Sequence, residues 1–123
     1  MNFDELSKKV IGCAIEVHRE LGPGLLESTY EHCLAYELKS IGLVVKQQHA
    51  LPVHYKEVHL DCGYRIDMLV DDAIILELKS VSKILDIHRA QLLTYMRLSH
   101  IKTGLLLNFN ARVLKNGLER FVL

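Results

Sequence analysis

The segment 64–79 constrains the fold more than any other part of the chain, because apolar and charged residues alternate along both of its halves. This period of two predicts a β-hairpin with strands 64–70 and 74–79. A one-residue slip in pairing moves every side chain to the opposite face, so the hydrophobic pattern selects the register. A two-residue loop would mix apolar and charged side chains on both faces. A three-residue loop, 71–73, makes one face entirely apolar and opposes three pairs: Ile66 and Leu78, Met68 and Leu76, Val70 and Ile74.

The selected register has a chemical consequence on the other face of the hairpin. It sets Asp67 opposite Glu77 and Arg65 opposite Lys79. Directly opposed Cβ atoms lie about 4.5–5.5 Å apart, so the two carboxylates repel each other. A hard divalent cation such as Mg²⁺ or Mn²⁺ removes this repulsion and gains two oxygen ligands. The alternative is a protonated or water-bridged acid pair on a solvated face.

The rest of the chain predicts helices and further strands around this hairpin. Apolar residues recur at helical spacing over Asp4–Leu21 and Leu25–Ser40, which Gly22-Pro23-Gly24 separates. Asp86 is placed to cap a third helix over 87–99. Further strands are predicted over 43–45, 50–55, 58–60, 102–109 and, after the Asn116-Gly117 turn, 118–122. We therefore expect an α/β fold with a mixed central β-sheet flanked by helices.

Length and composition narrow the class of protein. A chain of 123 residues that is 50% apolar suits a single domain, 1–123, with one core. It has no run of about 18 apolar residues, and the acidic start, 1–5, does not resemble a signal peptide, so we expect a cytoplasmic protein.

Cysteine and histidine spacing argues against a zinc site. Cys13, Cys33 and Cys62 are far apart, which predicts reduced and mostly buried thiols. The seven histidines form no HxxxH or HExxH pattern, although His54 and His59 flank a predicted turn and are expected to be neighbours.

The net charge of zero hides an asymmetry along the chain. Residues 97–123 carry five basic residues and one acidic residue, a balance of +4, and residues 1–96 balance at −4. Two interpretations stay open. A basic C-terminal part contacts phosphates while acids elsewhere bind metal, or the asymmetry is a chance feature of a solvated surface.

Four motifs together resemble a known class of enzyme. Asp67, nine further residues and Glu77-Leu78-Lys79 resemble the pattern of the PD-(D/E)XK nuclease superfamily. Gly24, Glu27 and Tyr30 match the motif of its GxxExxY family, and the chain resembles that family over nearly its whole length, including 16–18 and 104–110. The segment 63–67 resembles the glycine-led approach to the first acid, and Gln91 with Tyr95 resembles the QxxxY helix of RecB-type nuclease domains. The resemblance implies a restriction-endonuclease-like fold with an αβββαβ core.

The resemblance also implies roles for the residues around the paired acids. Asp67, Glu77 and the Leu78 carbonyl would bind Mg²⁺ or Mn²⁺, and Lys79 would orient the attacking water or stabilise negative charge. Glu27 would be a further metal ligand; from local sequence alone it is instead an acid in the first helical turn, with Gly24 as the cap.

Helical spacing supplies the remaining candidates. His88, Gln91 and Tyr95 form a polar stripe on one helix side. By resemblance, Gln91 and Tyr95 border the active centre; the equally open alternative is that they lock the helix to the sheet by hydrogen bonds. By the same resemblance, His18 supports Glu27 across the Gly-Pro-Gly corner, whereas Tyr30 is expected to pack rather than take part in chemistry.

These inferences predict a Mg²⁺- or Mn²⁺-dependent nuclease that hydrolyses phosphodiester bonds in DNA, at ends, flaps or single strands. The alternative is a catalytically silent nucleic-acid-binding or protein-interaction module with the same fold. A small, neutral chain offers little surface to hold a duplex, which favours a homodimer or a partner protein. The absence of GxSxG, P-loop and GxGxxG motifs argues against a small-molecule hydrolase.

Overall fold

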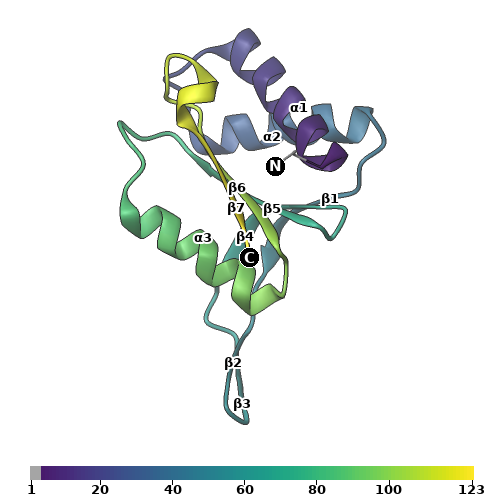
Figure 1. Cartoon of the computed structure of the whole chain (residues 1–123), viewed down its shortest axis with the longest axis vertical. Helices are drawn as coiled ribbons and strands as arrows, with labels where there is room; N and C mark the ends of the chain where they lie inside the picture. Colours follow the sequence, from purple (N-terminus) through teal and green to yellow (C-terminus); the bar gives the residue numbers. More distant parts are fainter. Residues whose placement is uncertain (1–3) are drawn as a thin grey trace.

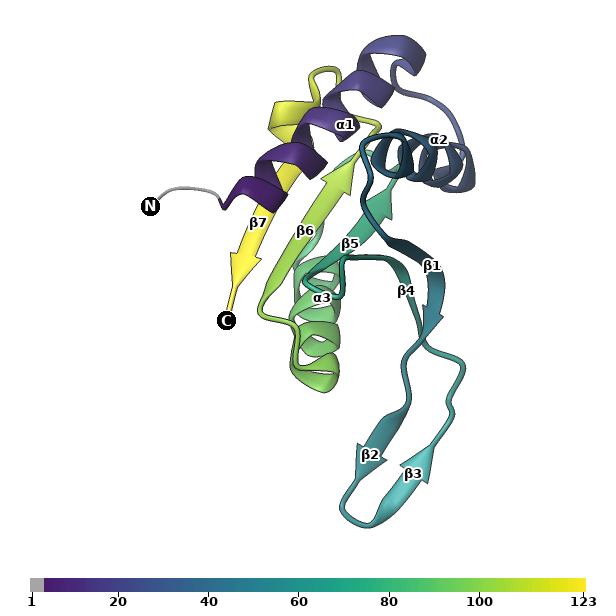
Figure 2. The same ribbon diagram turned by 90° about the vertical axis from the view of Figure 1, so that its right-hand side faces the viewer.

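A five-stranded mixed sheet with helices on both faces forms the centre of the protein in the computed structural model, which describes residues 4–123 (Figures 1 and 2). The elements are α1 (Glu5–Leu21), α2 (Glu27–Ser40), β1 (Val45–Ala50), β2 (Val53–Tyr55), β3 (Val58–Leu60), β4 (Arg65–Val70), β5 (Ile74–Lys79), α3 (Asp86–Ser99), β6 (Thr103–Asn108), the 3₁₀ helix η1 (Leu114–Gly117) and β7 (Leu118–Val122). The main sheet has the order β1-β4-β5-β6-β7. Only β5 and β6 pair in parallel among these strands. This arrangement confirms the expected α/β fold with a mixed sheet flanked by helices.

Two apolar clusters cover the two faces of the sheet. One cluster joins α1 and α2 to the sheet, and the other joins α3 to it, in agreement with the opposite placement of these helices in Figure 1. The central strand β5 contributes to both clusters, since Leu76 contacts the first and Ile75 the second. The β2–β3 hairpin forms a separate two-stranded sheet that extends away from the main sheet in both views.

The β4–β5 hairpin has the predicted register. Met68 pairs with Leu76 and Val70 with Ile74, so the loop is 71–73 as the apolar pattern required. Asp71 and Asp72 both adopt φ of 52°, a left-handed conformation that aspartate tolerates better than most residues. Hydrophobic alternation therefore identified this turn correctly.

The predicted pairing stops three residues short of the hairpin's open end. The β4–β5 ladder ends at Met68, so the expected pairs of Asp67 with Glu77, Ile66 with Leu78 and Arg65 with Lys79 are not formed. Ile66 joins the apolar cluster on the α3 side rather than the side of Met68, and its predicted place beside Met68 is wrong. A local distortion accompanies this change: Gln48, which lies across from Asp67 in β1, has φ of 48°, outside the extended range of a regular strand.

Helix boundaries differ from the prediction at two N-termini. α2 begins at Glu27, two residues later than expected, with Leu26 as its N-cap. α3 begins at Asp86, and its N-cap is Leu85, whose N–H donates to Nδ1 of His88 at 3.0 Å. The predicted capping role of Asp86 is therefore wrong, because an imidazole three residues later satisfies the helix terminus.

Strand boundaries differ where the backbone cannot continue pairing. The strand expected over 50–55 divides at Leu51-Pro52, because proline offers no N–H for a ladder. The strand expected over 43–45 begins only at Val45, and Asn116-Gly117 lies in η1 rather than in a two-residue turn.

The cysteine and histidine expectations were correct in part. All three cysteines are free, but only Cys13 is buried and Cys62 is exposed, so "mostly buried" was wrong. His54 and His59 pair across β2 and β3 with ring centroids 4.1 Å apart, which confirms that they are neighbours. No helix within residues 4–123 is long and apolar enough to span a membrane.

We expect Gly117→Ala to destabilise the protein. A Cβ at this position would lie 2.5 Å from the backbone oxygen of Asn108 at the end of β6, and a backbone atom cannot move aside cheaply. The expected loss is about 1–3 kcal/mol in the free energy of unfolding, measured by urea denaturation. Gly12→Ala is the control, since a Cβ there meets nothing within 4 Å inside α1, and it should stabilise by about 0.5–1 kcal/mol. Equal stability of the two variants would contradict the packing of η1 on β6.

Candidate active site

A polar pocket of about 200 Å³ lies between β4, β5 and α3. Asp67 enters it from β4, and Glu77 and Lys79 enter from the end of β5. The polar stripe of α3 that the sequence predicted, His88, Gln91 and Tyr95, lines the remaining side of the pocket. The lining residues are Arg65, Asp67, Glu77, Lys79, His88, Gln91 and Tyr95. We call this the acid–lysine pocket. Tertiary structure thus gathers in one place six of the residues that the sequence singled out.

Asp67 is held by the backbone of the neighbouring strand. Its Oδ2 accepts a hydrogen bond from the Leu78 N–H at 2.9 Å. This carboxylate oxygen serves as the acceptor for β5 where β4 no longer pairs with it. Its Oδ1 lies 3.4 Å from Nε2 of Gln48, which donates to it. Asp67 therefore has a defined orientation even though the expected direct pairing with Glu77 is absent.

Glu77 is the most perturbed acid of the pocket. Its side chain sits in the middle strand with 6% of its surface exposed, and Oε1 has no hydrogen-bond partner within the described residues. Burial, the hydrogen bond with Asp67 and the charge of Asp67 raise the pKa of Glu77 to about 10, while Lys79 acts in the opposite direction. Without a bound cation this carboxyl is therefore neutral at pH 7, and its side chain lies close enough to Asp67 to interact with it.

Tyr95 approaches the acids from α3. Burial, and then the negative charge of Glu77, raise the pKa of the Tyr95 phenol above its usual value. The phenol is therefore a hydrogen-bond donor at neutral pH. Gln91, four residues earlier, is exposed at the mouth of the same pocket.

Lys79 and His88 supply the nitrogen groups of the pocket. Lys79 is half-buried at the end of β5, and its backbone oxygen accepts from the Phe109 N–H at 2.9 Å, which holds this end of the strand. His88 lines the pocket while its Nδ1 caps α3. His88 thus has a structural task beside any contact with a substrate.

Glu27 lies in a second pocket on the other side of Asp67. Asp67 borders both pockets, whereas Leu78 and Glu27 border only this one. The Glu27 Oε2 accepts from the Ser80 N–H at 3.2 Å, which joins the start of α2 to the end of β5. Because α2 begins at Glu27, the expected Gly24 cap is wrong, although Glu27 does stand in the first turn.

Sequence reasoning missed a polar cluster behind Asp67. Glu31 is buried, and its carboxylate accepts from Nε2 of Gln47 at 2.9 Å and from Nε2 of Gln48 at 2.7 Å. Neighbouring residues of a regular strand point to opposite faces, so the positive φ of Gln48 explains how both amides reach one carboxylate. Glu31 follows Glu27 by four residues on α2, and that spacing was the one available signal.

A second missed residue holds the loop after β5. The buried Asn108 accepts from the Val81 N–H at 3.1 Å and donates to the Val81 oxygen at 2.9 Å. A polar residue that ends the apolar run of β6 was the visible signal. Asn108 therefore fixes the backbone that follows Lys79.

The remaining candidates from α1 and α2 have structural contacts. His18 donates from Nε2 to the Ala111 oxygen at 2.7 Å, so its partner is the loop after β6 rather than the expected Glu27. Tyr30 is fully buried and stacks on Phe109 with centroids 4.6 Å apart. Its hydroxyl donates to the Gly22 oxygen at 2.6 Å and accepts from the Leu25 N–H at 3.1 Å. These contacts agree with the packing interpretation of Tyr30.

The basic residues of the C-terminal part do not form one patch. Lys102 precedes β6 and Arg112 follows it, so the two lie at opposite ends of that strand. Arg120 is largely buried and bonds to Asp4 at 3.4 Å. These basic residues therefore lie apart from one another, and both interpretations of the charge asymmetry stay open.

The oxygen-rich donor set defines what the pocket can hold. Within residues 4–123, no group of three or more His, Cys, Asp or Glu side chains is arranged to hold a metal ion. The pocket offers two carboxylates, those of Asp67 and Glu77. Oxygen donors of this kind suit hard cations rather than zinc.

Comparison with known proteins gives one match. A family model described as the PD-(D/E)XK nuclease superfamily matches residues 4–121. Searches of curated proteins and of solved structures found no match. The match is to the superfamily, so the finer GxxExxY assignment stays a prediction.

We expect Glu77→Gln to stabilise the metal-free protein near neutral pH. The pKa of Glu77 rises from 4.5 in the unfolded chain to about 10 in the folded protein, so folding above pH 4.5 requires this acid to take up a proton. The contribution of Glu77 to the stability of the folded state is therefore fully present below pH 4.5 and is lost as the pH rises toward 10. Glutamine is neutral throughout. In EDTA, the variant's advantage in unfolding free energy should grow from near zero at pH 4.5 to about 3 kcal/mol at pH 7. The exposed Glu57→Gln is the control, and a pH-independent difference for Glu77→Gln would contradict the burial of this acid.

Tyr30→Phe should destabilise the protein while the ring remains stacked on Phe109. The change removes one hydroxyl that bonds to both Gly22 and Leu25, so the expected loss is about 1–2 kcal/mol in unfolding free energy. Tyr36→Phe on the exposed side of the same helix should change stability by less than about 0.5 kcal/mol. Thermal and urea unfolding compare the two, and equal effects would mean that the hydroxyl does not hold the corner before α2.

Proposed function

Because the chain belongs to the PD-(D/E)XK nuclease superfamily, we propose that it is a divalent-metal-dependent nuclease that hydrolyses phosphodiester bonds in DNA. The observation that carries this proposal is the buried Glu77 carboxyl, whose Oε1 lacks a partner within the described residues, beside Asp67 and Lys79 in one pocket. Buried polar atoms are nearly always satisfied, so an orphaned carboxylate oxygen in a pocket calls for a ligand. Proteins of this superfamily generally use divalent metal ions.

The residues present fit Mg²⁺ or Mn²⁺. Asp67 and Glu77 offer carboxylate oxygens, and the Leu78 carbonyl is the proposed third protein ligand. The N–H and C=O of one strand residue point to the same side, and the Leu78 N–H is directed to Asp67. The Leu78 carbonyl therefore faces the same edge, where β4 has left the ladder. A bound cation would neutralise the acid pair, lower the pKa of water and polarise phosphate oxygens.

The nitrogen and hydroxyl groups of the pocket complete the proposed chemistry. The Lys79 ammonium lies on the same face as Glu77 and would stabilise the negative charge that develops on the phosphate. The protonated Tyr95 phenol and the Gln91 amide would donate hydrogen bonds to phosphate oxygens or to the attacking water. All three groups come from rigid elements, β5 and α3, which keeps them oriented before substrate binds.

The residues behind Asp67 would act through it. Gln48 donates to both Glu31 and Asp67, so the chain Glu31–Gln48–Asp67 restricts the rotation of the Asp67 carboxylate. We assign Glu31 and Gln48 as positioning residues. Glu27 is proposed as an additional ligand from the second pocket, which Asp67 also borders.

A cleavage assay with matched variants tests the proposal. Labelled single-stranded, duplex and branched DNA, and matching RNA, are incubated with the protein in Mg²⁺, Mn²⁺ or EDTA. We expect metal-dependent cleavage that Asp67→Asn and Lys79→Ala reduce about 100-fold or more, as loss of a group that stabilises the transition state does. The exposed Glu20→Gln on α1 and Lys83→Ala are the controls that remove a charge of the same sign, and they should cleave like the wild type.

Metal binding is measured separately from cleavage. Mn²⁺ should raise the melting temperature of the wild type and of Glu20→Gln but not of Asp67→Asn, because a ligand stabilises only the state that binds it. If folded protein neither binds Mn²⁺ nor cleaves any substrate, the nuclease proposal is wrong and the catalytically silent binding module is favoured. Undiminished cleavage by Asp67→Asn would show that the reaction occurs elsewhere.

A further inference from the structure

A groove continues from the acid–lysine pocket along α3. A cavity of about 520 Å³ lies between α3 and the base of the β2–β3 hairpin, where Val53, Cys62 and Tyr64 line it, and the hairpin itself extends past α3 (Figures 1 and 2). Gln91 and Tyr95 line both this cavity and the acid–lysine pocket, so the two are adjacent. We call the cavity and its extension past Leu98 the α3 groove.

The first part of the α3 groove is mainly apolar and carries two aromatic rings. Tyr64, which is 46% exposed, lies with its ring centroid 6.2 Å from that of Tyr95. Ile87 is 60% exposed beside them although it is a large aliphatic residue. Exposed aromatic and aliphatic surface of this kind matches the flat faces of nucleobases, which stack on aromatic side chains with little sequence preference.

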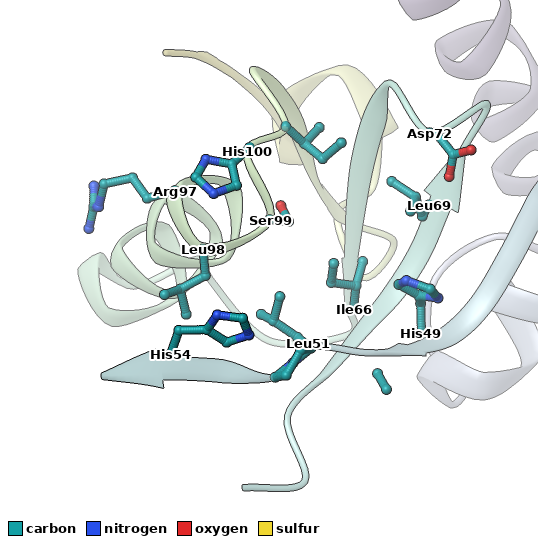
Figure 3. Close-up of a pocket in the computed structure, with 13 residues that line it drawn as sticks. His49, Leu51, His54, Ile66, Leu69, Asp72, Arg97, Leu98, Ser99 and His100 are labelled. Carbon is teal, nitrogen blue, oxygen red and sulfur yellow. The ribbon is translucent and has the colours of Figure 1, made fainter. Parts of the chain in front are cut away.

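The second part of the groove, which we call the cationic part, carries the guanidinium of Arg97. Leu98 also lines a cavity of about 560 Å³ at the end of α3 (Figure 3), which Arg97, His100, His54 and His49 border. Figure 3 shows Arg97 on α3 and His100 directly after it, with His54 of β2 on the other side of the cavity.

The charge of this part is not cancelled by the nearby acid. Asp72, the acid of this lining, is engaged by Lys46 at 2.9 Å. Arg97 donates to Thr94 Oγ1 at 3.2 Å, which directs its guanidinium along α3 toward the first part, and it forms no ion pair within residues 4–123.

The spacing along the helix matches a few nucleotides. α3 rises about 1.5 Å per residue, so Gln91 and Arg97 are separated by roughly 9 Å along its axis. Phosphates of one B-form strand follow one another every ~3.4 Å along the axis, and an extended strand spaces them further apart. The cationic part therefore lies within two or three nucleotides of the acid–lysine pocket.

We propose that the α3 groove binds one unpaired polynucleotide strand, with bases on the Tyr64–Tyr95 surface and a phosphate at Arg97, next to the phosphate that is cut. The inference rests on the proposed function, because the cut phosphate is placed at the acid–lysine pocket. In a duplex the base faces are covered by their neighbours, so they cannot use the apolar part. The sequence of acids, aromatic rings and the Arg97 guanidinium along α3 favours a nucleic-acid strand over an apolar peptide, which carries no negative charge for Arg97 to bind.

Binding is tested without cleavage. Fluorescence anisotropy in EDTA measures the affinity of the full chain for labelled oligothymidylate, oligouridylate and a blunt DNA duplex at several salt concentrations. Comparison of oligothymidylate with oligouridylate shows whether the unpaired strand that binds is DNA, RNA or either. We expect both single strands, or one of them, to bind at least tenfold more tightly than the duplex.

Matched variants assign the binding to the groove. Arg97→Ala should weaken single-strand binding about tenfold and reduce the slope of log affinity against log salt by about 0.7, the value for one phosphate contact on a single strand. Tyr64→Ala should weaken it about tenfold through lost stacking, and Tyr64→Phe should restore it. The controls are Lys115→Ala, beyond the other end of β6, and Tyr36→Ala on α2, both of which should bind within twofold of the wild type.

The outcomes separate this inference from the proposed function. Single-strand binding that depends on Arg97 and Tyr64 supports the groove even if the protein cleaves nothing. Cleavage of DNA by Arg97→Ala and Tyr64→Ala at wild-type rate and affinity would overturn the groove while leaving the nuclease intact. Tighter binding to duplex than to either single strand would also overturn it.

Discussion

The hydrogen bond from the Leu78 N–H to Asp67 Oδ2 is the interaction on which the candidate active site depends. β4 and β5 pair only as far as Met68 and Leu76, and beyond this point the buried N–H of Leu78 needs another acceptor. A buried donor without one would cost about 1–3 kcal/mol. The Asp67 carboxylate fills this place, and in doing so it is fixed beside Glu77 at the edge where α3 crosses. The gap in the β4–β5 ladder therefore leaves the Asp67 carboxylate oriented beside Glu77 before any ligand binds.

The burial of Glu77 follows from its place in the fold. β5 is the middle strand of the main sheet, with β4 on one side and β6 on the other, so a polar side chain near its end is screened from water. Such a carboxyl resists ionisation unless a positive charge arrives, and the raised pKa expresses this physically. The proposed cation supplies that charge together with Lys79. In the absence of a cation, Glu77 holds a proton instead.

Sequence reasoning was most accurate where a local pattern carried its own physical reason. The hairpin loop 71–73 and the polar side of α3 were predicted correctly, because apolar periodicity of two and of 3.6 residues determines which side chains share a face. It was inaccurate where the partner of a residue lies far away in the chain. His18 bonds to Ala111, 93 residues later, and the amides that hold Glu31 come from a strand whose regular alternation is broken at Gln48. No local spacing encodes either contact.

The sequence by itself determined which residues are candidates for the chemistry: two acids and a lysine on one hairpin, and a glutamine and a tyrosine four residues apart on one helix. It did so because strand and helix periodicities are local properties, set by a few neighbouring residues. Only the tertiary structure decided that β4 leaves β5 at Asp67, that Glu77 is buried, and that the base of the β2–β3 hairpin and α3 enclose a cavity. These features depend on pairing between segments distant in the chain and on the exclusion of water by that pairing. The candidate residues were therefore visible in the sequence, whereas the electrostatics of the pocket and the cavity beside it required the fold.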